Sequence, residues 1–229
     1  MDSNDFAKFL SRISSTPLRV LDTSIPNSKY IYLDLSYDNS NLEKIDASSS
    51  ESLSRFVNSH IKLHHALVAF GGYNEIRSIY QRSNHFNINQ ETERNVHLGI
   101  DLWCGTNTPI YAPIDARVHS FKNNKNHGDY GPTIILKHVI KDVLFYTLYG
   151  HLSMDSILNL KVGQFFKKGD CIARLGDSDV NGDYPPHLHF QIIKDIESYT
   201  GDYPGVCSKN DLDFYLKNCP DPNLILKLA

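Results

Sequence analysis

Residues 133–149 read TIILKHVIKDVLFYTLY, two apolar and aromatic runs separated by the polar pair Lys141-Asp142. Branched and aromatic side chains favour strands, and a polar pair between two such runs is typical of a tight hairpin turn. Further short runs of this kind lie on both sides of the hairpin, at 110–112, 116–119, 171–175 and 187–193. Many short strands close together along a chain indicate an antiparallel sheet or a small barrel-like core. The stretch therefore predicts a mainly β fold.

The character of the sequence changes near residue 90, which predicts two parts. Residues 1–90 are expected to form a mixed α/β, partly helical N-terminal extension whose role the residues do not reveal. Its expected elements are a helix near 6–13, a strand near 30–35, a helix from Ser50 up to Gly71-Gly72, and a polar loop near Asn84-His85. Because this loop leads into the first histidine-bearing segment, the extension could cap the groove. Residues 91–229 are expected to form a compact antiparallel β domain that ends in a short helical tail.

Composition narrows the functional classes. The 229 residues carry 23 Lys and Arg against 26 Asp and Glu, so the net charge is −3, and this balance speaks against nucleic-acid binding. No apolar run approaches the length of about 20 residues that a membrane helix needs, so we expect no membrane insertion. The first residues, MDSNDFAKFL, lack the pattern of a signal peptide. We therefore expect a cytoplasmic protein, or one of the cell envelope or medium if a leader has been removed. The oligomeric state stays open.

Histidine is the unusual residue, with 11 copies, and one segment reads Val96-His97-Leu98-Gly99-Ile100-Asp101-Leu102. A central glycine among alternating apolar residues argues against a helix. In a fully extended chain His97 and Asp101 would be about 13 Å apart. Gly99 allows the backbone to bend and to shorten this gap.

Two further segments carry histidines on predicted strands. In Pro185-Pro186-His187-Leu188-His189-Phe190 the prolines favour extended backbone, and the period of two places His187 and His189 on the same face. The third segment, Tyr149-Gly150-His151-Leu152-Ser153, places one histidine at the end of an apolar strand. One carboxylate and several imidazoles on β elements suit zinc, which in catalytic sites commonly takes three protein ligands and one water. Two histidines and one aspartate would fill that set, leaving one or two histidines for proton transfer.

The three segments together resemble, in order and spacing, the motifs of the lysostaphin-type zinc metallopeptidases. The connecting stretches 105–113, 162–164 and 167–170 resemble the same family, so the likeness covers about residues 94–195. It implies that His97, Asp101 and His189 hold Zn²⁺ and that His151 and His187 are catalytic histidines that do not bind the metal. It also implies a metalloendopeptidase with a compact antiparallel β core, which hydrolyses peptide bonds in peptidoglycan-derived peptides. His187 is the first choice for the general base, with His151 assisting at the oxyanion or the leaving amine, but the two roles could be exchanged.

Some residues depart from the family pattern. The run 181–186 replaces a small-residue segment, Gln191 stands where glutamate is common, and Ala116 stands where glycine is common. None of these differences falls on an implied metal ligand. They alter the groove that is expected to bind the substrate. The segment also resembles the peptidase-like middle part of long chains that join a kinase-like domain to an aminotransferase, which would imply a cytoplasmic setting. Two alternatives therefore remain: hydrolysis of a small intracellular amide, or an inactive relative that binds a peptide or a partner.

Overall fold

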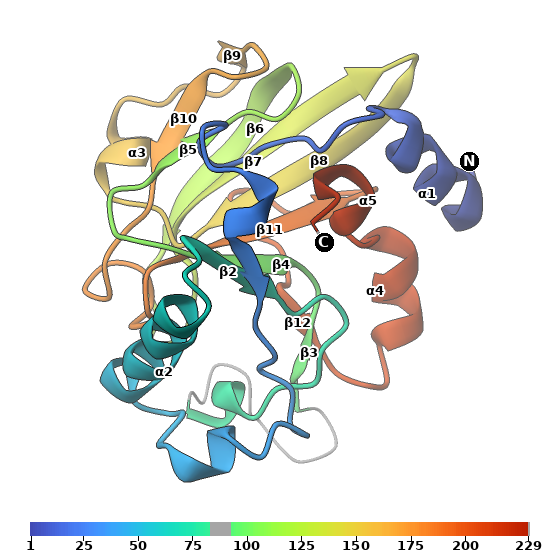
Figure 1. The fold of residues 1–229 in the computed structure, drawn as a ribbon. Coiled ribbons are helices and arrows are strands. Elements are labelled where there is room, and N and C mark those ends of the chain that lie inside the picture. Colours follow the sequence, from blue (N-terminus) through green and yellow to red (C-terminus); the bar gives the residue numbers. More distant parts are fainter. Residues whose placement is uncertain (83–92, 229) are drawn as a thin grey trace.

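The computed structural model describes residues 1–82 and 93–228, in which one large sheet dominates (Figure 1). Its strands run in the order β1-β2-β4-β11-β8-β7-β6-β9, and all neighbours are antiparallel except β1 and β2. The strands are β1 (Tyr30–Tyr32), β2 (Val68–Gly71), β4 (Ile100–Trp103), β6 (Ala116–Asn124), β7 (Gly131–Ile140), β8 (Val143–Gly150), β9 (Phe165–Phe166) and β11 (His187–Ile193). The mainly β, antiparallel fold is confirmed. The sheet is open, with β1 and β9 as its two edges, rather than a closed barrel.

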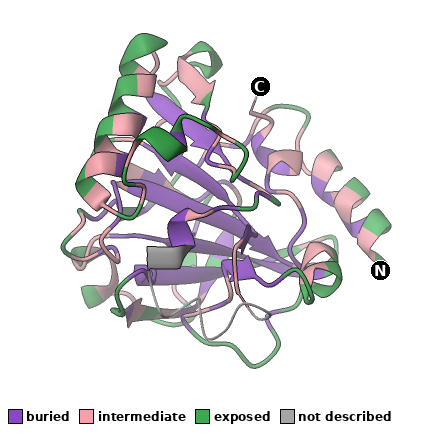
Figure 2. Ribbon diagram, turned by 90° about the horizontal axis from the view of Figure 1, so that it is seen from below, coloured by how far each residue is buried: buried purple, intermediate pink, exposed green. Residues whose placement is uncertain are grey.

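Two small sheets and the helices surround this sheet. Strand β5 (Pro109–Tyr111) pairs with β10 (Cys171–Arg174), and β3 (Val96–His97) pairs with β12 (Val206–Cys207). The α-helices are α1 (Ser3–Arg12), α2 (Ser50–Leu63), α3 (Asp155–Leu158), α4 (Leu212–Asn218) and α5 (Asn223–Leu226). Short 3₁₀ turns lie at Asn27–Lys29, Leu42–Lys44 and Ile79–Arg82. Figure 2 shows the central strands buried and the outer faces of the helices exposed.

The predicted hairpin at 133–149 is confirmed. Strands β7 and β8 pair in register from Ile134 with Tyr149 to Ile140 with Val143. Both turn residues, Lys141 and Asp142, have positive φ angles of 49° and 64°. Two central residues of that kind are the signature of a type I′ turn, whose twist matches that of the flanking strands.

The helix predicted to run from Ser50 to Gly71 is too long. Helix α2 ends at Leu63, and His65 adopts a positive φ of 50°. The following run Val68–Gly71 is a wholly buried strand between β1 and β4. A four-residue apolar run fits a buried strand as well as a helix, so its periodicity could not distinguish the two.

Strands from both sides of residue 90 lie side by side in the large sheet. Strands β1 and β2 continue it beyond β4, and Ala69 pairs with Trp103 while Gly71 pairs with Asp101. Helix α1 packs its Phe6 against Phe145 of β8, with ring centroids 6.0 Å apart. The loop predicted near 84–85 lies outside the described residues.

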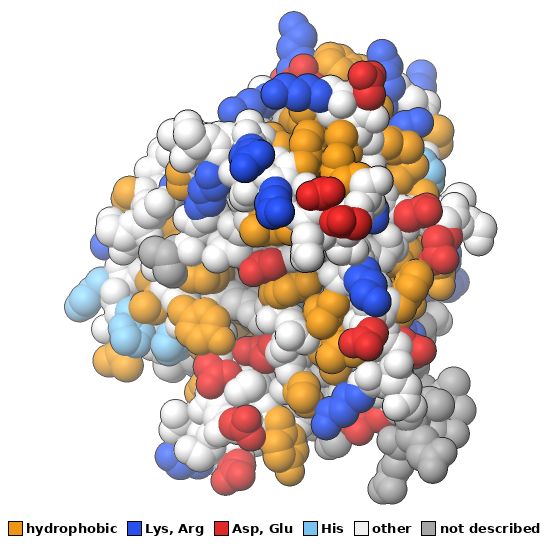
Figure 3. All heavy atoms as spheres, turned by 90° about the vertical axis from the view of Figure 1, so that its right-hand side faces the viewer, with side chains coloured by type: hydrophobic (Ala, Val, Ile, Leu, Met, Phe, Trp, Pro, Cys, Tyr) orange, Lys and Arg blue, Asp and Glu red, His pale blue; other side chains and the backbone are white. Residues whose placement is uncertain are grey.

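The surface agrees with the modest net charge. On the face shown in Figure 3, side chains of both signs occur from top to bottom, among scattered exposed apolar groups. Within residues 1–82 and 93–228, none of the helices combines the length and the apolar composition that crossing a bilayer requires.

His138 on β7 is a buried histidine outside the three histidine-bearing segments that form the predicted site. Its Nδ1 donates to the carbonyl of Asp115 at 3.1 Å, its Nε2 lies 2.8 Å from the hydroxyl of Thr147, and its ring stacks on Phe145. Burial, opposed by the bond to the Asp115 carbonyl, lowers its pKa to about 4. The folded protein therefore holds this imidazole in its neutral form.

Acidification is expected to destabilise the fold through His138. An ordinary histidine titrates at a pKa of about 6.5, so between about pH 6.5 and 4 the unfolded chain binds a proton here that the folded chain does not. The stabilisation is complete above that window and is lost as the pH falls through it. Between about pH 7.5 and pH 5, the free energy of unfolding should fall by about 2 kcal/mol more in the wild type than in His138→Gln. Urea unfolding at both pH values measures this.

The exposed His64 provides the control for that experiment, because His64→Gln removes a histidine without touching the core. This variant should keep the pH dependence of the wild type. An unchanged pH dependence in His138→Gln would show that His138 does not contribute.

Candidate metal and catalytic site

The register of three neighbouring strands brings the predicted site residues into one row. His189 of β11 lies opposite Asp101 of β4 on one side and opposite Gly150 of β8 on the other. His151 follows Gly150 directly, at the end of β8. His187 is two residues before His189 on the same strand, so both imidazoles project from one face.

His97 joins this row because the chain bends between β3 and β4. Strand β3 ends at His97 and β4 begins at Ile100, with Leu98 and Gly99 between them. A Cβ on Gly99 would lie 2.6 Å from Cε1 of His189 and 2.8 Å from the carbonyl oxygen of Phe190. Only a glycine therefore allows the chain to pass so close to His189. The sequence-based expectation of a bend at this glycine is confirmed.

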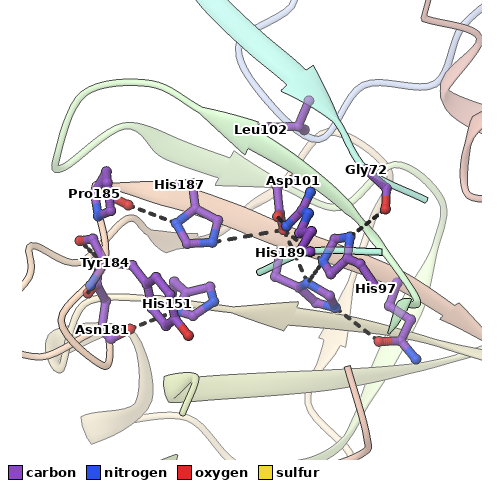
Figure 4. A network of polar contacts seen from close by, with 12 residues as sticks. Gly72, His97, Asp101, Leu102, His151, Asn181, Tyr184, Pro185, His187 and His189 are labelled. Carbon is purple, nitrogen blue, oxygen red and sulfur yellow. Dashed lines mark hydrogen bonds and ion pairs between the residues drawn. The ribbon is translucent and has the colours of Figure 1, made fainter. Parts of the chain in front are cut away.

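Three side-chain atoms converge at the centre of the site (Figure 4). Nε2 of His97 lies 2.9 Å from Nδ1 of His189 and 3.3 Å from Oδ1 of Asp101, and the last two atoms are 3.2 Å apart. In a tetrahedral zinc site with bonds of about 2.0–2.1 Å, two ligand atoms are about 3.3 Å apart. The spacing and the donor set of two imidazoles and one carboxylate both fit a zinc ion.

Outer hydrogen bonds orient the two imidazoles of this group. Nδ1 of His97 donates to the carbonyl of Gly72 at 2.8 Å, which leaves the lone pair on Nε2. Nε2 of His189 lies 2.9 Å from Oε1 of Gln191, whose amide nitrogen donates to the carbonyl of Pro204 at 3.1 Å. His189 therefore donates from Nε2 and keeps the lone pair on Nδ1. Such outer partners fix the tautomer that a metal ligand needs, and Gln191 performs this task although it departs from the family pattern.

Burial keeps the imidazole of His97 neutral. His97 is 1% exposed, and burial, aided by the charge of Arg77, lowers its pKa to about 3. For Asp101, burial acts to raise the pKa, but His97 and Arg77 lower it, and the pKa lies well below its usual range. At neutral pH His97 is thus a neutral imidazole and Asp101 a carboxylate, the protonation states that bind a metal.

His151 and His187 lie beside this group with their rings 4.1 Å apart. Nδ1 of His151 donates to the carbonyl of Asn181, and Nδ1 of His187 donates to the carbonyl of Pro185, each at 2.7 Å. Burial lowers the pKa of both imidazoles. In the neutral form each ring therefore has its lone pair on Nε2, and Nε2 of His187 is 3.8 Å from Oδ1 of Asp101.

All five predicted side chains line one cleft of about 220 Å³. Aromatic groups shape its walls: Tyr184 packs against the rings of both His151 and His187, and Tyr130 lies 5.1 Å from the ring of His189. The residues of 1–90 that line this cleft were not predicted, Arg77 above all. No periodicity or spacing in the sequence marks an arginine for burial beside a carboxylate that is 24 residues further along the chain.

Replacing Gly99 with alanine is expected to disrupt the site. The added methyl group would push against the His189 ring and the backbone of β11, and overpacking of this kind costs about 1–3 kcal/mol. We expect a lower melting temperature and zinc binding weakened at least about tenfold, since a misplaced ligand costs metal affinity. Thermal unfolding and competition with a zinc chelator measure the two effects.

Gly105→Ala is the matched control, because a Cβ on Gly105 would meet nothing within 4 Å. It should bind zinc like the wild type. If Gly99→Ala also did so, the close approach at Gly99 would not matter for the site.

Comparisons with known proteins find a peptidase family and a metalloprotease among the matches. Residues 95–200 match the model of peptidase family M23. An uncharacterized metalloprotease of Haemophilus influenzae is 34% identical over 95 residues, which are 42% of this chain and 18% of that protein. The chain thus spans less than a fifth of the length of this curated relative.

Solved structures of peptidases resemble parts of the chain. The catalytic domain of lysostaphin from Staphylococcus simulans is 22% identical with a TM-score of 0.40, covering 71% of this chain and 96% of that one. A zinc-containing peptidase from Vibrio cholerae is 32% identical with a TM-score of 0.35, covering 48% of this chain and 31% of that one.

Proposed function

We propose that the protein is a zinc-dependent metallopeptidase that hydrolyses peptide bonds, since residues 95–200 match the model of peptidase family M23. One observation carries the proposal: His97, Asp101 and His189 present three converging ligand atoms inside the matched segment, 2.9–3.3 Å apart. We further propose that its substrates are peptides of the bacterial cell-wall class, as the motif resemblance implies.

The chemistry of a zinc ion suits this arrangement. Bound to three protein ligands, zinc lowers the pKa of a coordinated water to about 7 and polarises a carbonyl group. The protein holds the three ligands in a buried, pre-oriented triangle, and the hydrogen bonds from His97 to Gly72 and from His189 to Gln191 keep their lone pairs directed inward.

His187 and His151 supply proton transfer in this proposal. Both have Nε2 free to accept a proton in the neutral form, because Nδ1 of each donates to a backbone carbonyl. We assign the general base to His187, whose Nε2 is 3.8 Å from Oδ1 of Asp101. Once protonated, His187 can return the proton to the leaving amine. His151 can donate to a developing oxyanion only after it has gained a proton, since its neutral Nε2 is an acceptor.

The test combines metal analysis with a substrate screen. The purified chain should contain about one zinc per molecule by elemental analysis. It is then incubated with a mixed peptide library, with glycyl and D-alanyl peptides, and with peptidoglycan fragments, and the products are identified by mass. We expect cleavage that a chelator stops and added zinc restores.

Other outcomes of this screen decide against the proposal. Zinc binding without cleavage of any peptide would point to a peptide-binding or partner-binding relative. Cleavage of small amides alone would reject the cell-wall class, and a chain without bound zinc would reject the proposed chemistry altogether.

A further inference from the structure

Arg77 is a buried cation that reaches the centre of the site from outside the matched family segment. It lies between β2 and β3, its side chain is 1% exposed, and its backbone N–H donates to the carbonyl of Asn95 at 2.9 Å. Burying an arginine is costly unless its charge is paired and its donors are satisfied. The contacts of the Arg77 side chain therefore indicate why this residue is buried.

The guanidinium group is held on several sides. Nη1 donates to Oδ2 of Asp101 at 2.6 Å and to the hydroxyl of Tyr80 at 3.2 Å, and Nε donates to Oε2 of Glu75 at 2.5 Å. The remaining nitrogen, Nη2, has no acceptor among the described residues. It lies against the backbone of Gly72, where an added Cβ would come within 1.7 Å of it. The guanidinium plane is thus fixed by its neighbours.

The two carboxylate oxygens of Asp101 therefore have different partners. Oδ2 accepts the hydrogen bond from Arg77, whereas Oδ1 faces Nε2 of His97 and Nδ1 of His189 at 3.3 and 3.2 Å. A carboxylate that is free to rotate could present both oxygens to a metal ion. With Arg77 in place, only Oδ1 is directed at the point where the imidazoles converge.

Arg77 also reaches the proposed general base through one aromatic ring. Its Cζ lies 5.7 Å from the centroid of Trp103, within the range of a cation–π contact. The indole in turn stacks on the ring of His187, with centroids 5.7 Å apart and an angle of 20° between the planes. Trp103 and His187 are paired across β4 and β11, so sheet register and stacking hold the same two rings together.

We propose that Arg77 is a positioning residue of the site: it holds Asp101 as a one-oxygen ligand and, through Trp103, supports the orientation of His187. The inference rests on the proposed zinc function. It implies that a residue of the N-terminal extension, outside residues 95–200, completes the metal centre. Arg77 also balances charge, since the guanidinium lies between the carboxylates of Glu75 and Asp101.

The test uses the full chain with Arg77→Met, which removes the cation and keeps an unbranched, flexible side chain, and with Arg77→Lys, which keeps the charge. Arg55→Met is the matched control, since Arg55 is exposed on α2 and pairs only loosely with Glu51 at 3.7 Å. Each protein is loaded with Co²⁺ in place of zinc, and its visible spectrum reports the coordination number, because four-coordinate Co²⁺ absorbs much more strongly than six-coordinate Co²⁺. Zinc affinity, kcat, KM and thermal unfolding are measured alongside.

We expect Arg77→Met to show weaker cobalt absorption and zinc affinity reduced by about 10–100-fold, the usual effect of losing a group that orients a ligand. With cleavable peptide, kcat should fall while KM changes little. Arg77→Lys should recover part of each loss, because one ammonium group can reach Asp101 but cannot bridge both carboxylates. Arg55→Met should match the wild type.

A folded Arg77→Met protein with the wild-type cobalt spectrum and zinc affinity would overturn the inference. If Arg77→Met does not fold, Arg77→Lys decides, and wild-type values in that variant would overturn the inference in the same way. Wild-type protein that binds zinc but cleaves nothing would contradict only the proposed function. The cobalt spectra and the zinc affinities would then still test the role of Arg77. Wild-type protein that binds no zinc would defeat both.

Discussion

Replacing His189 with alanine is expected to abolish zinc binding and, with it, all hydrolysis. Nδ1 of His189 is 2.9 Å from Nε2 of His97 and 3.2 Å from Oδ1 of Asp101. Replacing His189 therefore removes one of the three proposed zinc ligands. The two remaining ligands, one imidazole and one carboxylate, fall short of the three that catalytic zinc sites use. Elemental analysis after dialysis should show about one zinc per chain in the wild type and almost none in His189→Ala.

His64→Ala is the control for that experiment, because His64 is an exposed histidine just beyond the end of α2. It should bind zinc like the wild type, and circular dichroism should show the same β content in all three proteins. Full zinc occupancy in a folded His189→Ala protein would remove His189 from the ligand set and would contradict the proposed centre.

Replacing His187 with alanine should have the opposite combination of effects: zinc is retained and activity is lost. The His187 ring lies beside the three proposed zinc ligands and is not one of them, since its Nε2 is 3.8 Å from Oδ1 of Asp101. Removing a general base typically lowers the rate by about 10²–10⁴-fold. Zinc content and the turnover of a peptide identified in the screen measure the two effects on the same preparation.

Equal loss of zinc in His187→Ala and His189→Ala would reject this division of roles. His151→Ala belongs in the same series, because its Nε2 is also an acceptor in the neutral form. A larger loss of rate in His151→Ala than in His187→Ala, with zinc retained in both, would transfer the role of base to His151.

Sequence reasoning succeeded where local geometry repeats. The period of two in a strand was enough to place His187 and His189 on one face, and the predicted hairpin has the expected turn at Lys141 and Asp142. The glycine in His97-Leu98-Gly99-Ile100-Asp101 indicated a bend, and the structure shows its reason, the close approach to the His189 ring.

Sequence reasoning failed where the outcome depends on distant neighbours. Residues 68–71 form a strand because β1 and β4 flank them, which no local pattern reveals. The local sequence also does not reveal the ion pair of Arg77. Its Nη1 comes within 2.6 Å of Oδ2 of Asp101 because β2 and β4 pair side by side.

The amino-acid sequence by itself determined the β character, the residues able to bind a metal, and their family resemblance, because strand period, turn chemistry and donor type are properties of short segments. Tertiary structure alone decided which lone pairs face inward, how Asp101 divides its two oxygens, and that the N-terminal extension contributes a cation to the centre. These features depend on hydrogen bonds between strands that are far apart along the chain. Their strength comes from burial, which makes each unpaired charge costly and each correctly placed partner necessary.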